Sequence, residues 1–366
     1  MKYISRSIDK TLEEWKESTT HKPLLLRGAR QVGKSSAVRH LGTQFKYFAE
    51  VNFESAKSIA TFFKGDLDVK LISSKISNYI QVPIIPGQTL LFLDEIQACP
   101  EAIMALRFFK EDYPELHVIA AGSLLEFALQ SLPTFGVGRI HSVFMYPMTF
   151  DEFLVAMDMG GLLAMRREAT ATHPLDAPFH DKLVNLFRTY LMVGGMPEAV
   201  ATWRETTDFL KCQQVHQDII LTYEDDFNKY GRRVNPELLR LTLHGVCHQI
   251  GQKLTLSRIS EGYRSAQIRE ALDLLTLAGL VIPVVGTSAN GVPLDAESDE
   301  KRAKYLFLDS GLLLAILHLD GQLGHDLIKL IMTATPQDLI NKGSITEMVA
   351  GLEISRYKSP VMRPRL

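Results

Sequence analysis

The residues best suited to chemistry by type and spacing form the segment Gly28-Ala-Arg-Gln-Val-Gly33-Lys34-Ser35, which matches the pattern GxxxxGK[ST]. The apolar run 24–26 precedes it and a helix-compatible segment, 36–41, follows it. In this order a glycine-rich turn directs backbone N–H groups at phosphate oxygens, and the helix N-terminus adds about half a positive charge. A plain glycine turn before a helix is the alternative. The segment therefore predicts a phosphate-binding loop of Gly28, Ala29, Arg30, Gln31, Val32, Gly33, Lys34, Ser35 and Ser36, with Lys34 on the β and γ phosphates and Ser35 on Mg²⁺.

Two carboxylates follow a second apolar run, Leu90–Leu93. Ligands of α/β sheets bind at the carboxyl ends of strands, which is where Asp94 and Glu95 are predicted to lie. We expect Asp94 to hold Mg²⁺ opposite Ser35 and Glu95 to accept a proton from an attacking water. Acidic residues after an apolar strand more often form a solvated turn, but the phosphate-binding loop favours the catalytic interpretation.

Ser123 and Arg139 are two further candidates. Ser123 follows the apolar run Val118–Ala121 and Gly122, and we expect it to contact the γ-phosphate or the attacking water. Capping of the next helix is the alternative. Arg139 precedes the fifth predicted strand, where it would neutralise charge on the transferred phosphoryl group, in cis or across a subunit boundary. A surface ion pair with an acidic residue is equally compatible with the sequence.

The elements that must position these residues are strands alternating with helices, up to about Met145. Such alternation predicts an α/β layer with a parallel sheet. The five strand candidates are Leu24–Arg27, Phe48–Phe53, Thr89–Asp94, His117–Ala121 and Ile140–Met145.

From Pro147 onward the strand signal stops, which places a domain boundary there. Apolar residues with a helical period continue through 150–165, 183–192 and 209–227. A third segment predicts helices at 238–250, from Ser257 and at 266–277, followed by strands at 279–285 and 304–308. Three helices and a two-stranded hairpin favour a winged-helix module.

Composition excludes several classes of protein. The 366 residues carry 40 basic and 42 acidic side chains, and 46% hydrophobic with 22% charged residues are typical of a globular protein of two or three domains. The three cysteines form no CxxC pair, which favours a reducing compartment. The start lacks the apolar region of a signal peptide, and the most apolar stretch, 274–285, is shorter than the roughly 20 residues of a membrane span. We therefore expect a cytoplasmic protein without a membrane anchor.

Six segments together resemble the bacterial and archaeal AAA-type P-loop ATPases that carry a C-terminal domain of unknown function (AAA_14/DUF4143-like). These segments are GARQVGKSS, TLLFLDEIQ, VIAAGS, GRIHSVFMYPMTFDEFL, YLMVGGMPEAV and KYLFLDSGLL. The resemblance implies an AAA+ core, a helical lid and a winged helix, with Walker A at 28–36, a Walker B pair at Asp94 and Glu95, and a sensor-1 position at Ser123. In related signal-transduction ATPases a glycine-proline motif of the lid lies near the adenine, and Gly194–Pro197 resembles this motif, which implies a contact of Pro197 with the nucleotide. A helix stop followed by a proline at the next helix start is the alternative for this motif.

The pattern and the resemblance divide the chain into a P-loop ATPase core (1–147), a helical lid (148–230), a winged helix (231–320) and the start of a nuclease-like domain (321–366). In the resembled family a nuclease-like fold usually follows, and the segment 343–349 resembles its opening helix. Glu347 alone cannot build a metal site, so nuclease activity is not expected. We expect residues 321–366 to be unstable, loosely docked or completed by a partner.

Three other interpretations are weaker. A helicase-type DExx box at 94–97 usually works between two core domains, and one phosphate loop is present. A GTPase needs NKxD, which neither Asn228-Lys229 nor Asn341-Lys342 begins. His244, Cys247 and His248 share one helical face and could offer metal ligands, but core packing is favoured.

The third segment is the basic part of the chain. Between Gly231 and Glu270, seven basic residues exceed three acidic ones (Glu237, Glu261, Glu270), a local net charge of +4. Such a cluster would suit DNA phosphates, whereas the acidic loop with Asp295, Glu297, Asp299 and Glu300 would not. DNA contact and protein contact both stay open. The seven basic residues are Arg232, Arg233, Arg240, Lys253, Arg258, Arg264 and Arg269.

The sequence as a whole predicts a Mg²⁺-dependent AAA+ ATPase that binds and hydrolyses ATP, and whose nucleotide state controls the arrangement of lid and winged helix. The alternative is a regulatory switch that retains ATP or ADP, hydrolyses little, and binds DNA or a protein partner. The oligomeric state is open, because Arg139 would act in trans only beside a neighbouring site.

Overall fold

The computed structural model describes residues 3–123, 125–131, 138–228, 234–287, 298–319, 328–329, 331, 333, 335 and 343–357. The chain divides into two compact units, one comprising essentially Lys2–Tyr146 and the other Pro147–Ser359.

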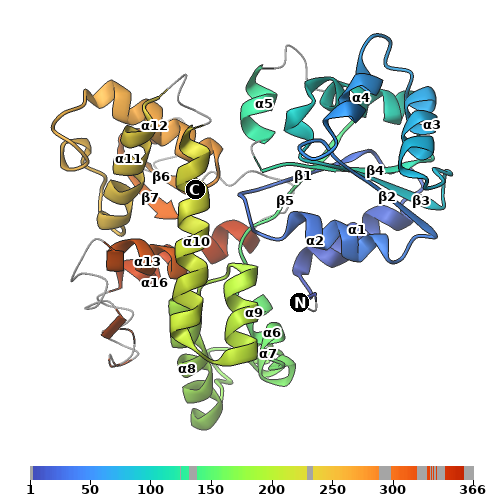
Figure 1. Cartoon of the computed structure of the whole chain (residues 1–366). Coiled ribbons are helices and arrows are strands. Elements are labelled where there is room, and N and C mark those ends of the chain that lie inside the picture. The colour runs from blue at the N-terminus through green and yellow to red at the C-terminus, as the bar shows by residue number, and fades with distance from the viewer. Residues whose placement is uncertain are drawn as a thin grey trace. The chain divides into compact units, whose positions relative to one another are not determined.

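A five-stranded parallel sheet forms the centre of the first unit (Figure 1). Its order is β2-β3-β4-β1-β5, and every neighbouring pair is parallel. The predicted α/β class is therefore confirmed, and each predicted strand differs from the observed one by at most one residue at either end. The strands are β1 (Leu24–Arg27), β2 (Tyr47–Asn52), β3 (Thr89–Asp94), β4 (His117–Ala121) and β5 (His141–Phe144).

Helices cover both faces of this sheet. Helices α1 and α2 lie on one face, and α3 and α4 lie on the other (Figure 1). Every residue of β3 and β4 is consequently buried, as expected for parallel strands covered on two sides. The helices of this unit are α1 (Ser7–Glu17), α2 (Lys34–Gly42), η1 (Lys57–Phe63), α3 (Val69–Ile80), η2 (Ile96–Ala98), α4 (Pro100–Asp112) and α5 (Leu125–Ser131).

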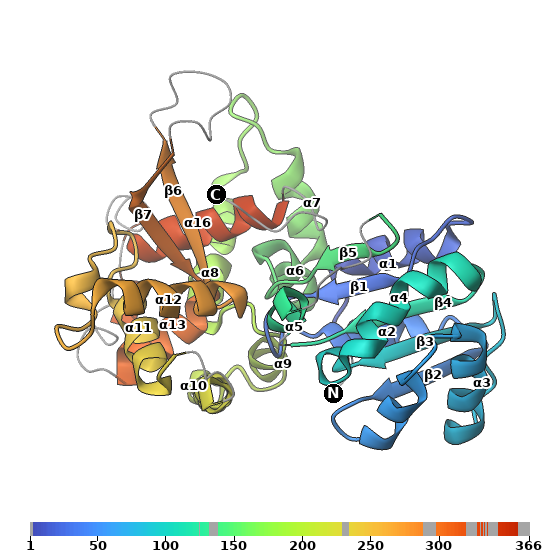
Figure 2. The same cartoon turned by 90° about the horizontal axis from the view of Figure 1, so that it is seen from above.

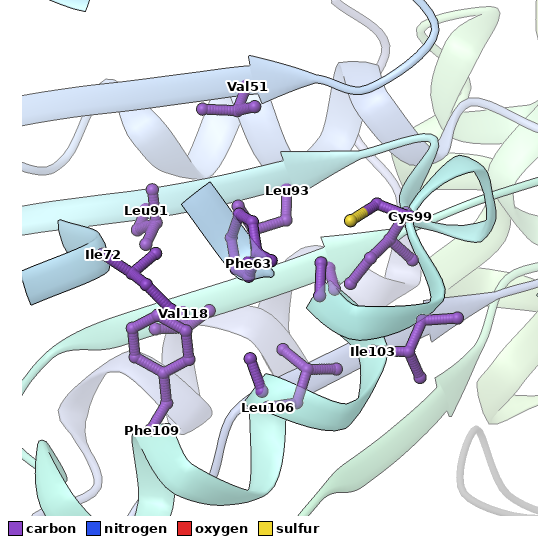
Figure 3. Packing of buried hydrophobic residues seen from close by; sticks show 14 of the residues in the cluster. Val51, Phe63, Ile72, Leu91, Leu93, Cys99, Ile103, Leu106, Phe109 and Val118 are labelled. Atoms are coloured by element: carbon purple, nitrogen blue, oxygen red, sulfur yellow. The ribbon is translucent and has the colours of Figure 1, made fainter. Parts of the chain in front are cut away.

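The core under α3 and α4 fixes which way the strand residues point. Leu91, Leu93 and Val118 project from the sheet toward Leu106 and Phe109 of α4 (Figure 3). Because successive side chains of a strand alternate between faces, the residue after Leu93 points to the opposite face, which α2 covers. That residue is Asp94, so the apolar packing of β3 decides on which face its carboxylate lies.

In its described residues the second unit is mainly helical, and its strands β6 and β7 pair antiparallel (Figure 2). The predicted helix at 150–165 is two helices, α6 and α7, because the chain turns at Asp158, whose φ is 57°. The helix expected from Ser257 is a single 3₁₀ turn, η4. The elements are α6 (Phe150–Ala156), α7 (Gly160–Glu168), α8 (Ala177–Val193), α9 (Pro197–Thr206), α10 (Phe209–Phe227), α11 (Pro236–His248), η4 (Leu256–Arg258), α12 (Ser265–Leu277), β6 (Val281–Thr287), β7 (Ser298–Phe307), α13 (Ser310–Leu319) and α16 (Ser344–Tyr357).

Helix α13 is central to this unit. It contacts α8, α10, α11 and α16, and its residues 312–317 are all buried. A helix that is apolar on all sides belongs in a core. Among the residues that the structure describes, no helix is long and apolar enough to cross a membrane.

Helix α16 is an integrated part of the second unit. Its residues Ile345, Met348, Val349 and Leu352 are buried. Glu353 Oε1 accepts a hydrogen bond from the backbone N–H of Phe150 at 3.1 Å. Loose docking, which we expected for this part of the chain, is therefore wrong for residues 344–357. The other expectations for 321–366 concern residues that are mostly outside the described ones.

At the amino end of the sheet, His117 packs in an aromatic cluster. Its ring stacks on that of His21, with centroids 4.0 Å apart, and meets Trp15 edge-on at 5.3 Å. Nε2 donates to the Lys16 carbonyl at 3.0 Å, while Nδ1 is buried with no partner among the described residues. Burial lowers the pKa of His117 below 6.5, and the nearby His21 and Lys16 side chains lower it further. The hydrogen bond to the Lys16 carbonyl and the charge of Glu17 act in the opposite direction. The folded protein therefore disfavours the protonated ring relative to the unfolded chain.

We expect the free energy of unfolding to be highest above pH 6.5 and to fall as the pH drops below it, because the unfolded chain then binds more protons at His117 than the folded chain does. In a Trp203→Phe background, Trp15 is the sole tryptophan and its fluorescence reports urea unfolding of the first unit. Between about pH 7.5 and about pH 5.5, the parent should lose more stability than His117→Gln. Equal losses in both proteins would contradict this assignment.

Candidate functional site

The loop 28–33 between β1 and α2 depends on three left-handed residues. They are Gly28, Gln31 and Gly33, with φ of 136°, 64° and 97°. A Cβ on Gly28 would overlap the carbonyl oxygen of Met145. Met145 follows the neighbouring strand β5 and is held beside Gly28 because its N–H donates to the Arg27 carbonyl oxygen at 2.8 Å. Only glycine therefore fits at the first position of this loop.

Lys34 is buried at the first position of α2 and turns back into the loop. Its Nζ donates to the carbonyl oxygens of Gly28, at 3.0 Å, and of Ala29, at 2.7 Å. Burial lowers the pKa of Lys34 to about 8, against the opposing effect of the Glu95 and Asp94 carboxylates. An ammonium held in this way concentrates positive charge where the backbone N–H groups of the loop would bind an anion.

Asp94 ends β3 beside the first turn of α2. Ser35 Oγ donates to both carboxylate oxygens of Asp94 at 3.1 Å. Asn52 Nδ2 lies 3.4 Å from Oδ2, because the register pairs Asn52 with Asp94. Burial raises the pKa of Asp94, and the charge of Glu95 raises it further. A hydroxyl and a carboxylate brought together in this way are hard oxygen donors that fit Mg²⁺.

Glu95 lies at the other side of this cluster in a left-handed conformation, with φ of 49°. Its Oε2 accepts from Ser123 through both the backbone N–H, at 3.4 Å, and Oγ, at 3.3 Å. Gln97 donates to the same oxygen at 2.6 Å. A non-glycine residue with positive φ is uncommon and often marks a functional position.

Five of the predicted residues therefore converge: Lys34, Ser35, Asp94, Glu95 and Ser123. Of the remaining loop residues, Val32 is fully buried and its carbonyl accepts from Arg6 Nη1 at 3.0 Å, while Arg30 is half-buried and Ser36 is exposed on α2.

Comparison with known proteins agrees with this geometry. Residues 20–154 match the family model of the AAA domain, and residues 184–323 match that of a domain of unknown function, DUF8612. A Walker-type ATPase of Pyrococcus abyssi has a similar fold, with a TM-score of 0.52 and 16% identity over 86% of this chain and 96% of that one. The Orc1 protein of Aeropyrum pernix, solved in complex with DNA, aligns with a TM-score of 0.31 and 14% identity over 89% and 92% of the two chains, which is too distant to support an argument. No curated protein matches the sequence.

Residues 20–154 are an AAA domain. The resemblance of the chain to AAA-type P-loop ATPases followed by a domain of unknown function is thereby confirmed. The following domain is matched by DUF8612.

Two polar residues of the AAA domain were not anticipated, Asn52 and Gln97. Asn52 is the last residue of β2 and the last but one of the strand predicted at Phe48–Phe53. A polar residue near the carboxyl end of a neighbouring strand was the signal that could have identified it. Gln97 lies two residues after Glu95, inside a motif in which only the acidic residues were assigned a role.

Arg139 lies away from the site in this chain. It precedes β5 and is therefore at the amino ends of the parallel strands, whereas the loop 28–33 follows the carboxyl end of β1. The four residues of β5 span about 13 Å. Arg139 Nε pairs with Glu111 Oε1 at 2.7 Å, so the predicted role in cis does not hold. A role in trans stays a prediction.

Two other predicted sites lie in the second unit. Pro197 is the first residue of α9, and its contact with adenine stays a prediction. Cys247 is buried in α11, and no group of His, Cys, Asp or Glu suited to a metal ion occurs among the described residues. Core packing, the alternative favoured from the sequence, holds for Cys247 alone: His244 is half-buried with Nε2 3.5 Å from Glu224 Oε1, and His248 is exposed.

We predict that Gly28→Ala destabilises the AAA domain more than Gly87→Ala. Both glycines have positive φ, but a Cβ at Gly87 meets no atom within 4 Å, whereas one at Gly28 overlaps the Met145 carbonyl. Backbone strain should cost about 1–2 kcal/mol in each variant, and the overlap should add about as much again in Gly28→Ala. Urea unfolding followed by Trp15 fluorescence in the Trp203→Phe background measures both losses. Equal losses would show that the close approach of Gly28 to Met145 does not contribute to stability.

Proposed function

We propose that this chain binds ATP together with Mg²⁺ and hydrolyses it to ADP and phosphate. The observation that carries the proposal is the convergence of Lys34, Ser35, Asp94 and Glu95 at the carboxyl ends of β1 and β3. The AAA domain family supports nucleotide as the ligand.

Each residue has a role that follows from its position. The loop amides and Lys34 bind the β and γ phosphates. Ser35 and Asp94 would hold Mg²⁺, which supplies neutralisation of the phosphate charge when it is bound. Glu95 accepts the proton of the attacking water, and Ser123 keeps the Glu95 carboxylate in place through Oε2.

The first prediction from this proposal concerns binding. Lys34→Ala should weaken ATP affinity about 10- to 100-fold, which is the contribution of one or two hydrogen bonds to a charged group. Titration calorimetry with ATP and Mg²⁺ measures it. Lys10→Ala, whose side chain is 84% exposed on α1, is the matched control and should bind as the wild type does. Equal affinity in Lys34→Ala and wild type would reject the site.

The second prediction concerns hydrolysis. Glu95→Gln should keep ATP affinity and lower kcat by about 10²- to 10⁴-fold, because the amide cannot accept the proton. Phosphate release under saturating ATP measures kcat, with the exposed Glu54→Gln as control. Unchanged turnover in Glu95→Gln with ATP still bound would favour the alternative function, a switch that retains nucleotide and hydrolyses little.

For the second unit we propose a helical lid in residues 148–230 and a winged helix in 231–320, whose arrangement follows the nucleotide state. The order α11, η4, α12 and the hairpin β6–β7 supports the winged helix, and α11 packs against α12 while α12 packs against β6. The single turn η4 takes the place of a full second helix.

The charges of this module are compatible with a protein partner and with DNA, because the predicted basic residues Lys253, Arg258 and Arg264 are exposed. Arg240 pairs with Glu224 and Glu237 and so presents little free positive charge. The exposed charged residues of α12 are Arg269, Glu270 and Asp273, which carry no net positive charge. Part of the predicted basic and acidic pattern, Arg232, Arg233, Asp295 and Glu297, lies outside the described residues.

A further inference from the structure

Gln97, in the 3₁₀ turn η2 that follows β3, contacts the proposed general base directly. Its Nε2 donates to Glu95 Oε2 at 2.6 Å, which is a shorter distance than either hydrogen bond from Ser123 to that oxygen. Three donors thus converge on one oxygen of the carboxylate. Among the described residues, no hydrogen bond to the other oxygen, Oε1, is present.

The Gln97 amide is held at an energetic cost. Its Oε1 is buried and has no hydrogen-bond partner among the described residues. It packs against Gly122, where a Cβ would overlap it. Rotating the amide by half a turn would bring its oxygen against the Glu95 carboxylate, so this orientation is fixed. A buried acceptor without a donor lowers the free energy of unfolding by about 1–3 kcal/mol. An apolar side chain of the same shape would not carry this penalty.

The backbone at Glu95 adds a second cost. The left-handed conformation of a non-glycine residue persists only where its surroundings hold it. Here the short turn 95–98 is closed by the hydrogen bond from the Ala98 N–H to the Glu95 carbonyl at 3.0 Å. The turn brings the Gln97 side chain back onto the carboxylate two residues earlier. Local energetic costs of this kind are expected where a side chain serves function rather than stability.

We propose that Gln97 is a positioning residue for hydrolysis: it anchors Glu95 through Oε2 so that Oε1 stays free to accept the proton of water. This inference rests on the proposed ATPase function with Glu95 as base. A glutamate side chain has three rotatable bonds, and fixing one oxygen restricts the direction from which the other can accept a proton. Ser123 alone, with its two longer hydrogen bonds, leaves that direction less restricted.

The test replaces the amide by an unbranched apolar side chain of similar length, Gln97→Met. We expect ATP affinity to stay within about twofold of wild type, since Gln97 contacts neither the loop 28–33 nor Asp94 among the described hydrogen bonds. We expect kcat to fall about 10- to 100-fold, as positioning effects do. The urea midpoint should stay the same or rise, because the unpaired acceptor is removed.

Gln44→Met is the matched control. Gln44 Nε2 also donates to a glutamate, Glu13 Oε1, at 3.0 Å, but on the exposed surface between α1 and the end of α2. The same chemical change there should leave both kcat and ATP affinity unchanged. A fall in kcat in both variants would show that the substitution acts non-specifically and would overturn the role of Gln97.

A double-mutant cycle with Glu95→Gln separates this inference from the proposed function. If Gln97 acts through Glu95, Gln97→Met should not lower kcat further in the Glu95→Gln background. An equal fold-loss in both backgrounds, a wild-type kcat in Gln97→Met, or a loss of stability that parallels kcat would each overturn the positioning role while leaving hydrolysis in place. A wild-type chain that binds ATP without turnover would overturn both.

Discussion

The close approach of Gly28 to the Met145 carbonyl is the contact on which the geometry of the site depends. Strand β5 pairs with β1 as far as Arg27, the last residue of β1. The carbonyl of Met145, the residue after β5, then leaves no room for a side chain at position 28. The loop must therefore turn immediately, and its first two carbonyls face Lys34 Nζ. Arg6, which precedes α1, joins both sides of this contact, since it donates to Val32 at 3.0 Å and to Tyr146 at 2.7 Å.

The position of the carboxylates follows from the sheet rather than from the loop. Leu93 packs under α4, and strand alternation then directs Asp94 to the face that α2 covers, where Ser35 lies in the first turn of the helix. The parallel register with β2 adds Asn52 at the same level. Once β3 ends, the left-handed turn at Glu95 sends the second carboxylate toward β4 and Ser123. Apolar packing and one strained residue thus separate two adjacent acids into two different surroundings.

Local patterns made the first unit predictable to a large extent. The strands are short apolar runs closed by turn residues, and the loop 28–33 is defined by glycines at fixed spacing, so both follow from sequence neighbours. Asn52 and Gln97 were missed because their contacts depend on strand register and on a positive φ at Glu95, which no local pattern encodes. Arg139 was misplaced although the predicted strands were sufficient to exclude it: a residue before a parallel strand lies at the edge opposite to the site.

In the second unit, the Gly194-Gly195 pair has a packing reason that the sequence did not reveal. Gly194 ends α8 with φ of 71°, and a Cβ there would overlap the Asp309 carboxylate. Asp309 is buried, accepts from the Gly195 N–H at 2.6 Å and caps α13 by accepting from Leu312 at 3.1 Å. These partners are more than a hundred residues apart in the chain, so only the tertiary fold brings them together. Gly194 is thus required by the packing of α8 against the start of α13, and Gly195 by the backbone of Met148, whose carbonyl oxygen a Cβ would overlap. Both reasons hold whether or not Pro197 contacts a nucleotide.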